Sequence, residues 1–158
     1  MIALCVDPGL ASIGLAALVF ERGQRARVIG AKTVRTSGAF HDRLREISRE
    51  AWRMVPQNGV PILHESLTNL PDKGATAKVW SGLSAVLCAH SGPVLSLDPQ
   101  AIKYRLCASR SASKARVAAV VADLVDGWDP SVDNHASDAA ASGLAIMQDP
   151  AAWRTLGA

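Results

Sequence analysis

The sequence predicts one mixed α/β domain with a central sheet, and three observations support this prediction. Strand-like apolar runs fill the first third of the chain, the hydrophobic spacing then becomes helical, and two more short apolar runs alternate with helical segments. The length of 158 residues suits a single domain. Because no repeat, low-complexity stretch or linker divides the chain, we expect residues 1–148 to form the domain and residues 149–158 a loose C-terminal tail.

The first three strands are expected to be consecutive and antiparallel. Apolar residues dominate positions 2–6 and 12–20, and residues 27–34 alternate between apolar and polar side chains. The breaks between these runs are short and contain Gly9 and Gly23, as hairpin connections require.

Helices and strands alternate in the rest of the chain. Phe40, Leu44 and Ile47 begin a series at helical spacing that reaches residue 54. Asp98 before Pro99 is a typical helix start, with a capping acid and a proline at the first helical position. The expected strands are residues 60–65 and 93–97, and the expected helices are residues 40–54, 75–90, 99 onward, 116–125 and 134–147.

The helix expected at residues 75–90 is apolar nearly all round. A helix without a polar face is either fully buried or shared with a partner. A domain of this size cannot easily bury every face of it, so we expect a homodimer formed through this helix around a two-fold axis.

Charge and composition narrow the class of protein. The formal net charge of +3 and the pI near 9.0 permit a polyanionic partner without requiring one. No apolar run approaches the ~20 residues of a membrane-spanning helix. Residues 1–10 lack the features of a signal peptide, and the three cysteines form no CxxC pair. We therefore expect a reducing, intracellular compartment, the cytoplasm. A bacterial or phage origin is expected rather than an organellar one, although the composition does not reveal the host.

Two acids follow predicted strands. Asp7 ends the first strand just before Pro8 and Gly9, and Glu65 ends the strand at residues 60–65. Open α/β sheets form their sites at such strand ends. Taken singly, Asp7 could equally be a turn-capping acid and Glu65 a solvated strand end.

An acid and an imidazole lie on the helix expected at residues 134–147. His135 and Asp138 are three residues apart and therefore share one face of that helix, among small residues that let another backbone approach. By themselves they are also compatible with a simple hydrogen bond within the helix. Together with Asp7 and Glu65 they form an oxygen-rich set that suits two Mg²⁺ ions, with Mn²⁺ as a substitute, for phosphodiester hydrolysis.

Over essentially its whole length the sequence resembles the RuvC-type Holliday-junction resolvases of the RNase H-like superfamily. The matching segments are VDPGLA at residues 6–11 with Ile13 and Gly14, Glu65, Ile102 with Lys103, SASK at residues 111–114, and HASDA at residues 135–139. The resemblance implies an RNase H-like five-stranded mixed sheet with helices on both faces. It also implies a homodimer that cuts four-way DNA junctions by paired, symmetric nicks.

The resemblance also implies roles for individual residues. Asp7, Glu65, His135 and Asp138 fall on the four metal-site positions of the family, and Lys103 and Lys114 fall on basic positions near the DNA backbone. No acid interrupts the basic residues from 103 to 116, although an ordinary solvated helix face would look the same. The expected DNA-binding residues are Lys103, Arg105, Arg110, Lys114, Arg116, Leu67, Thr68 and Lys73.

Two departures from the family pattern affect the expected DNA contacts. Many relatives carry an aromatic wedge three residues after the strand-end Glu, where this chain has Thr68, so Leu67 or Leu70 is the available apolar wedge. The glycines that precede the A-x-K segment in the family are replaced by Ala108 and Arg110.

The expected function is a Mg²⁺-dependent crossover junction endodeoxyribonuclease acting on Holliday junctions and related branched DNA. The alternative is a module of the same fold that binds branched DNA without cutting it. Half of a sugar- or acetate-kinase-type ATPase is a third reading, but 158 residues leave no room for its second domain.

Overall fold

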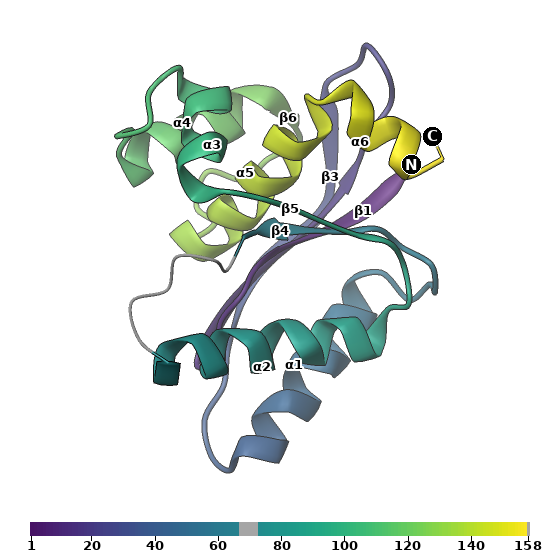
Figure 1. The fold of residues 1–158 in the computed structure, drawn as a ribbon, viewed down its shortest axis with the longest axis vertical. Helices are drawn as coiled ribbons and strands as arrows, with labels where there is room; N and C mark the ends of the chain where they lie inside the picture. Colours follow the sequence, from purple (N-terminus) through teal and green to yellow (C-terminus); the bar gives the residue numbers. More distant parts are fainter. Residues whose placement is uncertain (67–72, 158) are drawn as a thin grey trace.

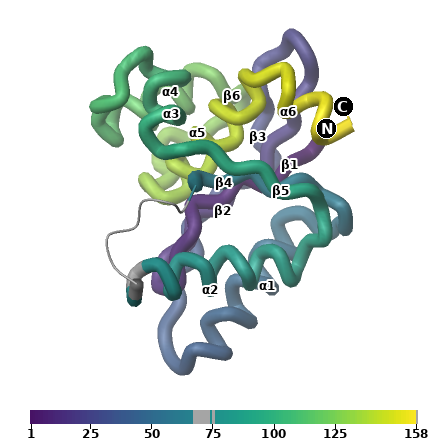
Figure 2. The backbone as a smooth tube through the Cα atoms, viewed as in Figure 1, coloured from purple at the N-terminus to yellow at the C-terminus, as the bar shows by residue number. Residues whose placement is uncertain are grey.

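The computed structural model describes residues 1–66 and 73–157. A six-stranded sheet lies between two helical layers, with α1 and α2 on one face and α3 to α6 on the other (Figures 1 and 2). The strands are β1 (Ile2–Asp7), β2 (Ser12–Val19), β3 (Ala26–Arg35), β4 (Ile62–Glu65), β5 (Val94–Leu97) and β6 (Val125–Asp126). The helices are α1 (Phe40–Met54), α2 (Lys73–Ala89), α3 (Pro99–Cys107), α4 (Lys114–Leu124), α5 (Asn134–Met147) and α6 (Pro150–Thr155).

The strand order is β5-β4-β1-β2-β3-β6, which places β1 inside the sheet. The antiparallel pairing of β1 with β2 and of β2 with β3 confirms the predicted succession of hairpins. The strands β4 and β5 add to the other side of β1 in parallel. The carboxyl ends of β1, β4 and β5 therefore meet at one edge of the sheet, where ligands bind in open α/β folds.

The sheet has one strand more than predicted. In β6, only Val125 and Asp126 pair with Ala26 and Arg27 of β3. Two residues are too few to show a strand periodicity, so β6 left no signal in the sequence.

Each face of the sheet has its own apolar core. Cys5 and Leu18 on one face pack with the long, almost wholly buried helix α5. Gly143 of α5 lies directly against Cys5, in a space that any side chain would fill. On the other face, Leu4 and Val6 pack with α1 and α2. Alternate residues of β1 thus face different helical layers, and Asp7 falls on the same face as Cys5.

The expectation of a loose C-terminal tail is wrong. Asp149 accepts a hydrogen bond from the Ala151 backbone N–H and begins α6 together with Pro150. Ala152 is buried, and the Trp153 indole N–H donates to the Met147 carbonyl at 2.9 Å. The Asp-Pro pair is the helix-start signal that also begins α3, and a short helix after it completes the core over α5.

None of the helices, over the residues that the structure describes, is long and apolar enough to cross a membrane.

Candidate active site

Asp7 lies at the end of β1, opposite Gly14 on the neighbouring strand β2. The absence of a side chain at Gly14 allows the first turn of α5 to approach, because a Cβ there would collide with the His135 carbonyl. On the other face, Gly82 of α2 lies equally close to the Gly9 carbonyl. Both helical layers therefore contact the hairpin that carries Asp7 and fix its position.

His135 is the direct partner of Asp7. Its Nδ1 lies 2.7 Å from Oδ2 of Asp7, although the two residues are 128 positions apart in the chain. The His135 side chain is 43% exposed and that of Asp7 is 19% exposed, so the pair lies at the edge of the core and is accessible to solvent on the imidazole side.

Asp133 holds the beginning of α5 in place. Its Oδ1 accepts hydrogen bonds from the His135 and Ala136 backbone N–H groups, as a helix-capping acid does. The Thr33 hydroxyl also donates to Asp133 Oδ1, and Arg35 forms an ion pair with Oδ2 at 2.6 Å. These contacts tie the start of α5 to β3. The partners of Asp133 on β3 are about a hundred residues away in the chain, so no local sequence pattern indicates these contacts.

Asp138 lies one turn further along α5. Its Oδ2 accepts a hydrogen bond from Lys114 Nζ at 2.8 Å, which joins α5 to the start of α4. This carboxylate holds the pKa of the Lys114 ammonium above its usual range. Lys114, a predicted DNA-binding residue, is thus next to a predicted metal ligand.

Glu65 completes the group of acids from the end of β4, the parallel neighbour of β1. Burial, together with the negative charges of Asp7 and Asp138, raises the pKa of Glu65 from its ordinary 4.5 to about 7. Burial also raises the pKa of Asp7, against the lowering effect of its hydrogen bond to His135. The four predicted metal-site residues therefore lie near enough to influence one another electrostatically.

The chemistry of these side chains fits a divalent cation. Three carboxylates and one imidazole form an oxygen-rich donor set, which Mg²⁺ and Mn²⁺ prefer. Burial is the main cause of the raised pKa values of Asp7 and Glu65, and repulsion by the neighbouring carboxylates adds to it. A bound cation would offset both effects. Among the described residues, no three His, Cys, Asp or Glu side chains are already arranged around a single metal position. Asp7 is instead bonded to His135, and Asp138 to Lys114.

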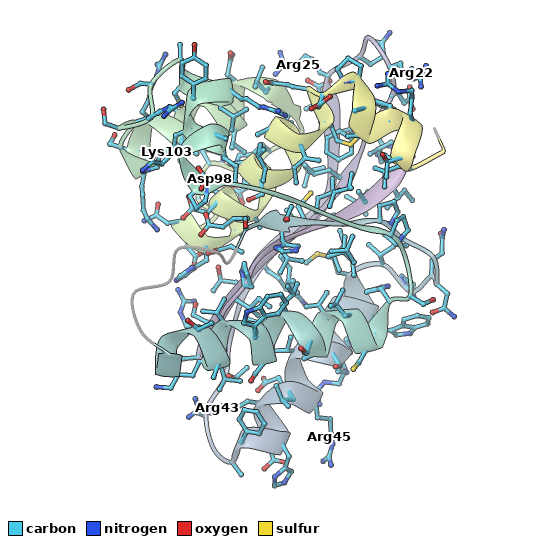
Figure 3. All side chains as sticks on the ribbon, viewed as in Figure 1. Arg22, Arg25, Arg43, Arg45, Asp98 and Lys103 are labelled. Atoms are coloured by element: carbon cyan, nitrogen blue, oxygen red, sulfur yellow. The ribbon has the colours of Figure 1, made fainter. Side chains whose placement is uncertain are left out.

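The predicted basic residues separate into two groups. Lys103, labelled on α3 in Figure 3, lies near enough to Glu65 for its charge to lower the pKa of that residue. Arg110 and Arg116 are exposed between α3 and the first turn of α4. Arg105 is not brought to the site, because it donates to the Ala145 carbonyl at 3.0 Å and contacts Asp149 at the opposite end of α5.

Three further residues predicted to contact DNA lie outside the part of the protein that the structure describes. Leu67 and Thr68, with Leu70 as the other suggested wedge, belong to residues 67–72, and the side chain of Lys73 is not described.

Ala108, one of the two residues found where the resemblance leads us to expect glycine, adopts a backbone conformation that favours glycine. Ala108 ends α3 with a φ of 55°, in the left-handed region, and its N–H donates to the Tyr104 carbonyl. Alanine adopts this conformation at a cost, since its Cβ crowds the backbone there.

Comparison with solved structures places this fold among known ones. The Thermus thermophilus RuvC structure has a TM-score of 0.74 and 24% sequence identity, covering 99% of this chain and 97% of that one. T. thermophilus RuvC in complex with a Holliday junction substrate has a TM-score of 0.79 and 23% identity, covering 99% and 96%. The fowlpox virus Holliday junction resolvase has a TM-score of 0.59 and 14% identity, covering 94% and 99%.

No protein-family model and no curated protein sequence matches this chain. At the identities of the solved structures, the likeness shows the fold. The chain has the RuvC-type, RNase H-like fold that the sequence resemblance implied, which confirms the predicted fold class.

Proposed function

We propose that this protein is a divalent-metal-dependent endonuclease that resolves Holliday junctions and related branched DNA by paired, symmetric nicks. One observation carries the proposal: Asp7, Glu65, His135 and Asp138 come from three distant parts of the sequence and gather at one end of the sheet. The fold that gathers them is shared with RuvC, one structure of which holds a Holliday junction substrate. The bacterial source of that structure agrees with the cytoplasmic location that we expect.

Asp7, Glu65 and Asp138, with His135, would hold Mg²⁺ in this proposal, with two ions per site and Mn²⁺ as a substitute. When bound, the metal would supply Lewis-acid stabilisation of the phosphate and a reactive water for phosphodiester hydrolysis. Asp7 is the central ligand of the set, because it alone touches His135 and also interacts with Asp138 and Lys114.

The chain's own residues would handle protons and position the DNA. The bond from His135 Nδ1 to Asp7 orients the imidazole and leaves Nε2 as the nitrogen that would either bind the metal or exchange a proton with water or with the leaving oxygen. Lys114 lies beside the carboxylates, where its ammonium would contact the DNA phosphate next to the cut. The DNA backbone on either side of the cut would be bound by Lys103, Arg110 and Arg116.

We also propose a homodimer formed through α2. The residues of α2 that point to solvent include Ala77, Trp80, Ser84 and Cys88, which follow one another at helical spacing. Trp80 is 49% exposed and presents a large apolar side chain on this face. Small residues beside it would let a second α2 approach closely. A two-fold axis there would match the symmetry of a four-way junction.

The decisive experiment compares cutting with binding on a labelled four-way junction. We expect the wild-type protein to nick two opposing strands in Mg²⁺ and to leave the junction intact in EDTA. Asp7→Asn should bind the junction normally but cut it at least about a thousandfold more slowly, because a lost metal ligand costs several kcal/mol in the transition state.

Asp129→Asn is the matched control, because Asp129 is an exposed loop acid whose carboxylate bonds the Ser131 backbone N–H rather than a candidate ligand. It should cut like the wild type. Binding of the junction without any nicking in Mg²⁺ or Mn²⁺ would favour the non-cutting module instead. Equal cutting by Asp7→Asn and wild type would contradict the proposed site.

A further inference from the structure

Lys114 places a positive charge among the carboxylates that would hold the metal. Its Nζ donates a hydrogen bond to Oδ2 of Asp138 at 2.8 Å. This bond is the main reason that the pKa of the Lys114 ammonium is raised, and the negative charges of Asp7 and Glu65 add to it. In the metal-free protein, the acid cluster is therefore partly neutralised by a cation that belongs to the chain itself.

A metal ion and the Lys114 ammonium would need the same carboxylate. Asp138 is one of the proposed metal ligands, and its Oδ2 already accepts the bond from Lys114. A divalent cation on this carboxylate would lie close to the ammonium, and two positive charges at short distance repel each other. Binding of the metal to Asp138 is therefore opposed for as long as Lys114 stays in place.

The Lys114 ammonium can leave Asp138 without any movement of the backbone. The Lys114 side chain is 62% exposed and has a long, flexible stem, whereas the Asp138 side chain is only 24% exposed. Lys114 is the first residue of α4, which is capped by Ser113 and is fixed independently of the ammonium. The start of a helix disfavours a cation, so the helix itself does not hold the charge against Asp138.

A DNA phosphate is the alternative partner of Lys114. The proposed function places the ammonium against the phosphate next to the cut, and this inference rests on that proposal. An ammonium that binds the phosphate gives up Asp138, which leaves the carboxylate cluster with more uncompensated negative charge. The cluster should then bind a divalent cation more tightly than it does in the protein without DNA.

We propose that Lys114 is an internal counter-ion that competes with the metal for Asp138 until a DNA phosphate draws it away. Metal and DNA would then bind cooperatively, and the protein without DNA would hold the metal weakly. Thermodynamic linkage requires that the junction tightens metal binding by the same factor by which the metal tightens junction binding.

The experiment measures Ca²⁺ binding by isothermal titration calorimetry, since Ca²⁺ takes oxygen ligands as Mg²⁺ does. Without DNA, Lys114→Met should bind Ca²⁺ about tenfold more tightly than the wild type, the effect of removing one charge-assisted hydrogen bond. Lys114→Arg keeps the charge and should stay within about threefold of the wild type.

The titration is then repeated with each protein saturated by an unlabelled four-way junction, with the junction alone as the blank. We expect wild type and Lys114→Met to bind Ca²⁺ with similar affinity in this state. The tightening caused by the junction should therefore be about tenfold smaller in the variant than in the wild type. Gels of the same samples report any cutting of the DNA.

Matched controls separate direct competition from a general loss of charge. Lys32→Met breaks a similar ion pair, with Glu50 of α1, and should leave Ca²⁺ binding unchanged. Lys103→Met removes another charge that acts on Glu65, but Asp138 is bonded to Lys114, so the tightening caused by the junction should persist. The NMR signal of Lys114 Nζ should shift when Ca²⁺ binds without DNA, because the ammonium then leaves Asp138.

Several results would overturn the proposal. They are equal Ca²⁺ affinity of wild type and Lys114→Met without DNA, equal tightening of both by the junction, or an unchanged Lys114 signal when Ca²⁺ binds. Absence of Ca²⁺ binding to both proteins would contradict it as well. Failure of the wild type to nick the junction in Mg²⁺ would contradict the nuclease alone, because the titrations without DNA measure the competition independently of cutting.

Discussion

At the scale of single residues, Glu65 links the electrostatics of the candidate site to pH. Its pKa of about 7 lies above its ordinary 4.5 because the folded protein buries the carboxyl group beside Asp7 and Asp138. Between these two pH values, the folded protein without metal keeps a proton that the unfolded chain has lost. Its free energy of unfolding therefore decreases as the pH rises through this range.

The first prediction follows from the direction of this pH dependence. In EDTA, the melting temperature should decrease from pH 5 to pH 8, and Glu65→Gln should reduce the decrease and raise the melting temperature at pH 8. Mg²⁺ should bind more tightly as the pH rises, because the carboxylate has to lose its proton first. Thermal unfolding over pH with and without Mg²⁺ checks both effects.

Glu46→Gln, on α1, serves as the control, since Glu46 does not contribute to the electrostatics of Glu65. A Glu65→Gln variant whose pH profile matches the wild type and the control would rule out this account of Glu65.

Ala108 gives a second prediction at this scale. It adopts a φ of 55° at the end of α3, where glycine avoids the steric cost of a Cβ. Ala108→Gly should therefore increase the free energy of unfolding by about 0.5–1 kcal/mol, measured in urea. Ala119→Gly, on an exposed position in the middle of α4, should decrease it by about 1 kcal/mol. Destabilisation by both substitutions would show that the turn at Ala108 is not strained.

At the scale of secondary-structure elements, the start of α5 determines where His135 and Asp138 lie. Asp133 accepts two backbone N–H groups there and is held from β3 by Thr33 and Arg35. The side chains of Thr33 and Arg35 also lower the pKa of Asp133, which keeps this cap ionised. The cap therefore connects the sheet to the helix that carries half of the candidate ligands.

The third prediction is that Asp133→Ala lowers the free energy of unfolding by about 1–2 kcal/mol, the cost of losing a helix cap. Junction cutting should slow more than junction binding weakens, because His135 loses its anchored backbone. Urea unfolding and single-turnover cutting measure the two effects, with Asp123→Ala on the exposed face of α4 as the control. Unchanged cutting by a folded Asp133→Ala protein would show that the cap does not position the site.

The elements also show what the sequence could and could not predict. Helix α1 and helix α5 have the predicted bounds, because their apolar spacing is regular and clear signals end them. The start of α4 lies two residues earlier than predicted, because Ser113 accepts the Arg116 N–H and caps it. The strand β6 and the bonds from β3 to Asp133 depend on residues far apart in the chain, which no local pattern reveals.

The sequence predicted which residues form the candidate site, but not how they pair with one another. The strand-end positions of Asp7 and Glu65 and the shared helix face of His135 and Asp138 indicated that they would converge. Only the three-dimensional structure reveals that Asp7 pairs with His135 and Asp138 with Lys114. It also shows that Arg105 contacts α5 instead of the site.

At the scale of the whole molecule, the exposed face of α2 is the proposed dimer contact. The fourth prediction is that Trp80→Glu produces a monomer in light scattering, because a buried charge without a partner is costly at a tight helix contact. The variant should then nick one strand of a junction at a time rather than two together. Phe40→Glu, at a comparably exposed aromatic residue on α1, should leave the dimer intact. Dimeric Trp80→Glu protein would place the dimer contact elsewhere.

The pairing of Asp7 with His135 spans 128 residues of the chain. During synthesis, Asp7 therefore leaves the ribosome well before α5, the helix that carries His135. A chain that stops before α5 therefore cannot assemble the candidate site. Long-range contacts of this kind also form slowly in folding, so the candidate site would form only after α5 has packed on the sheet.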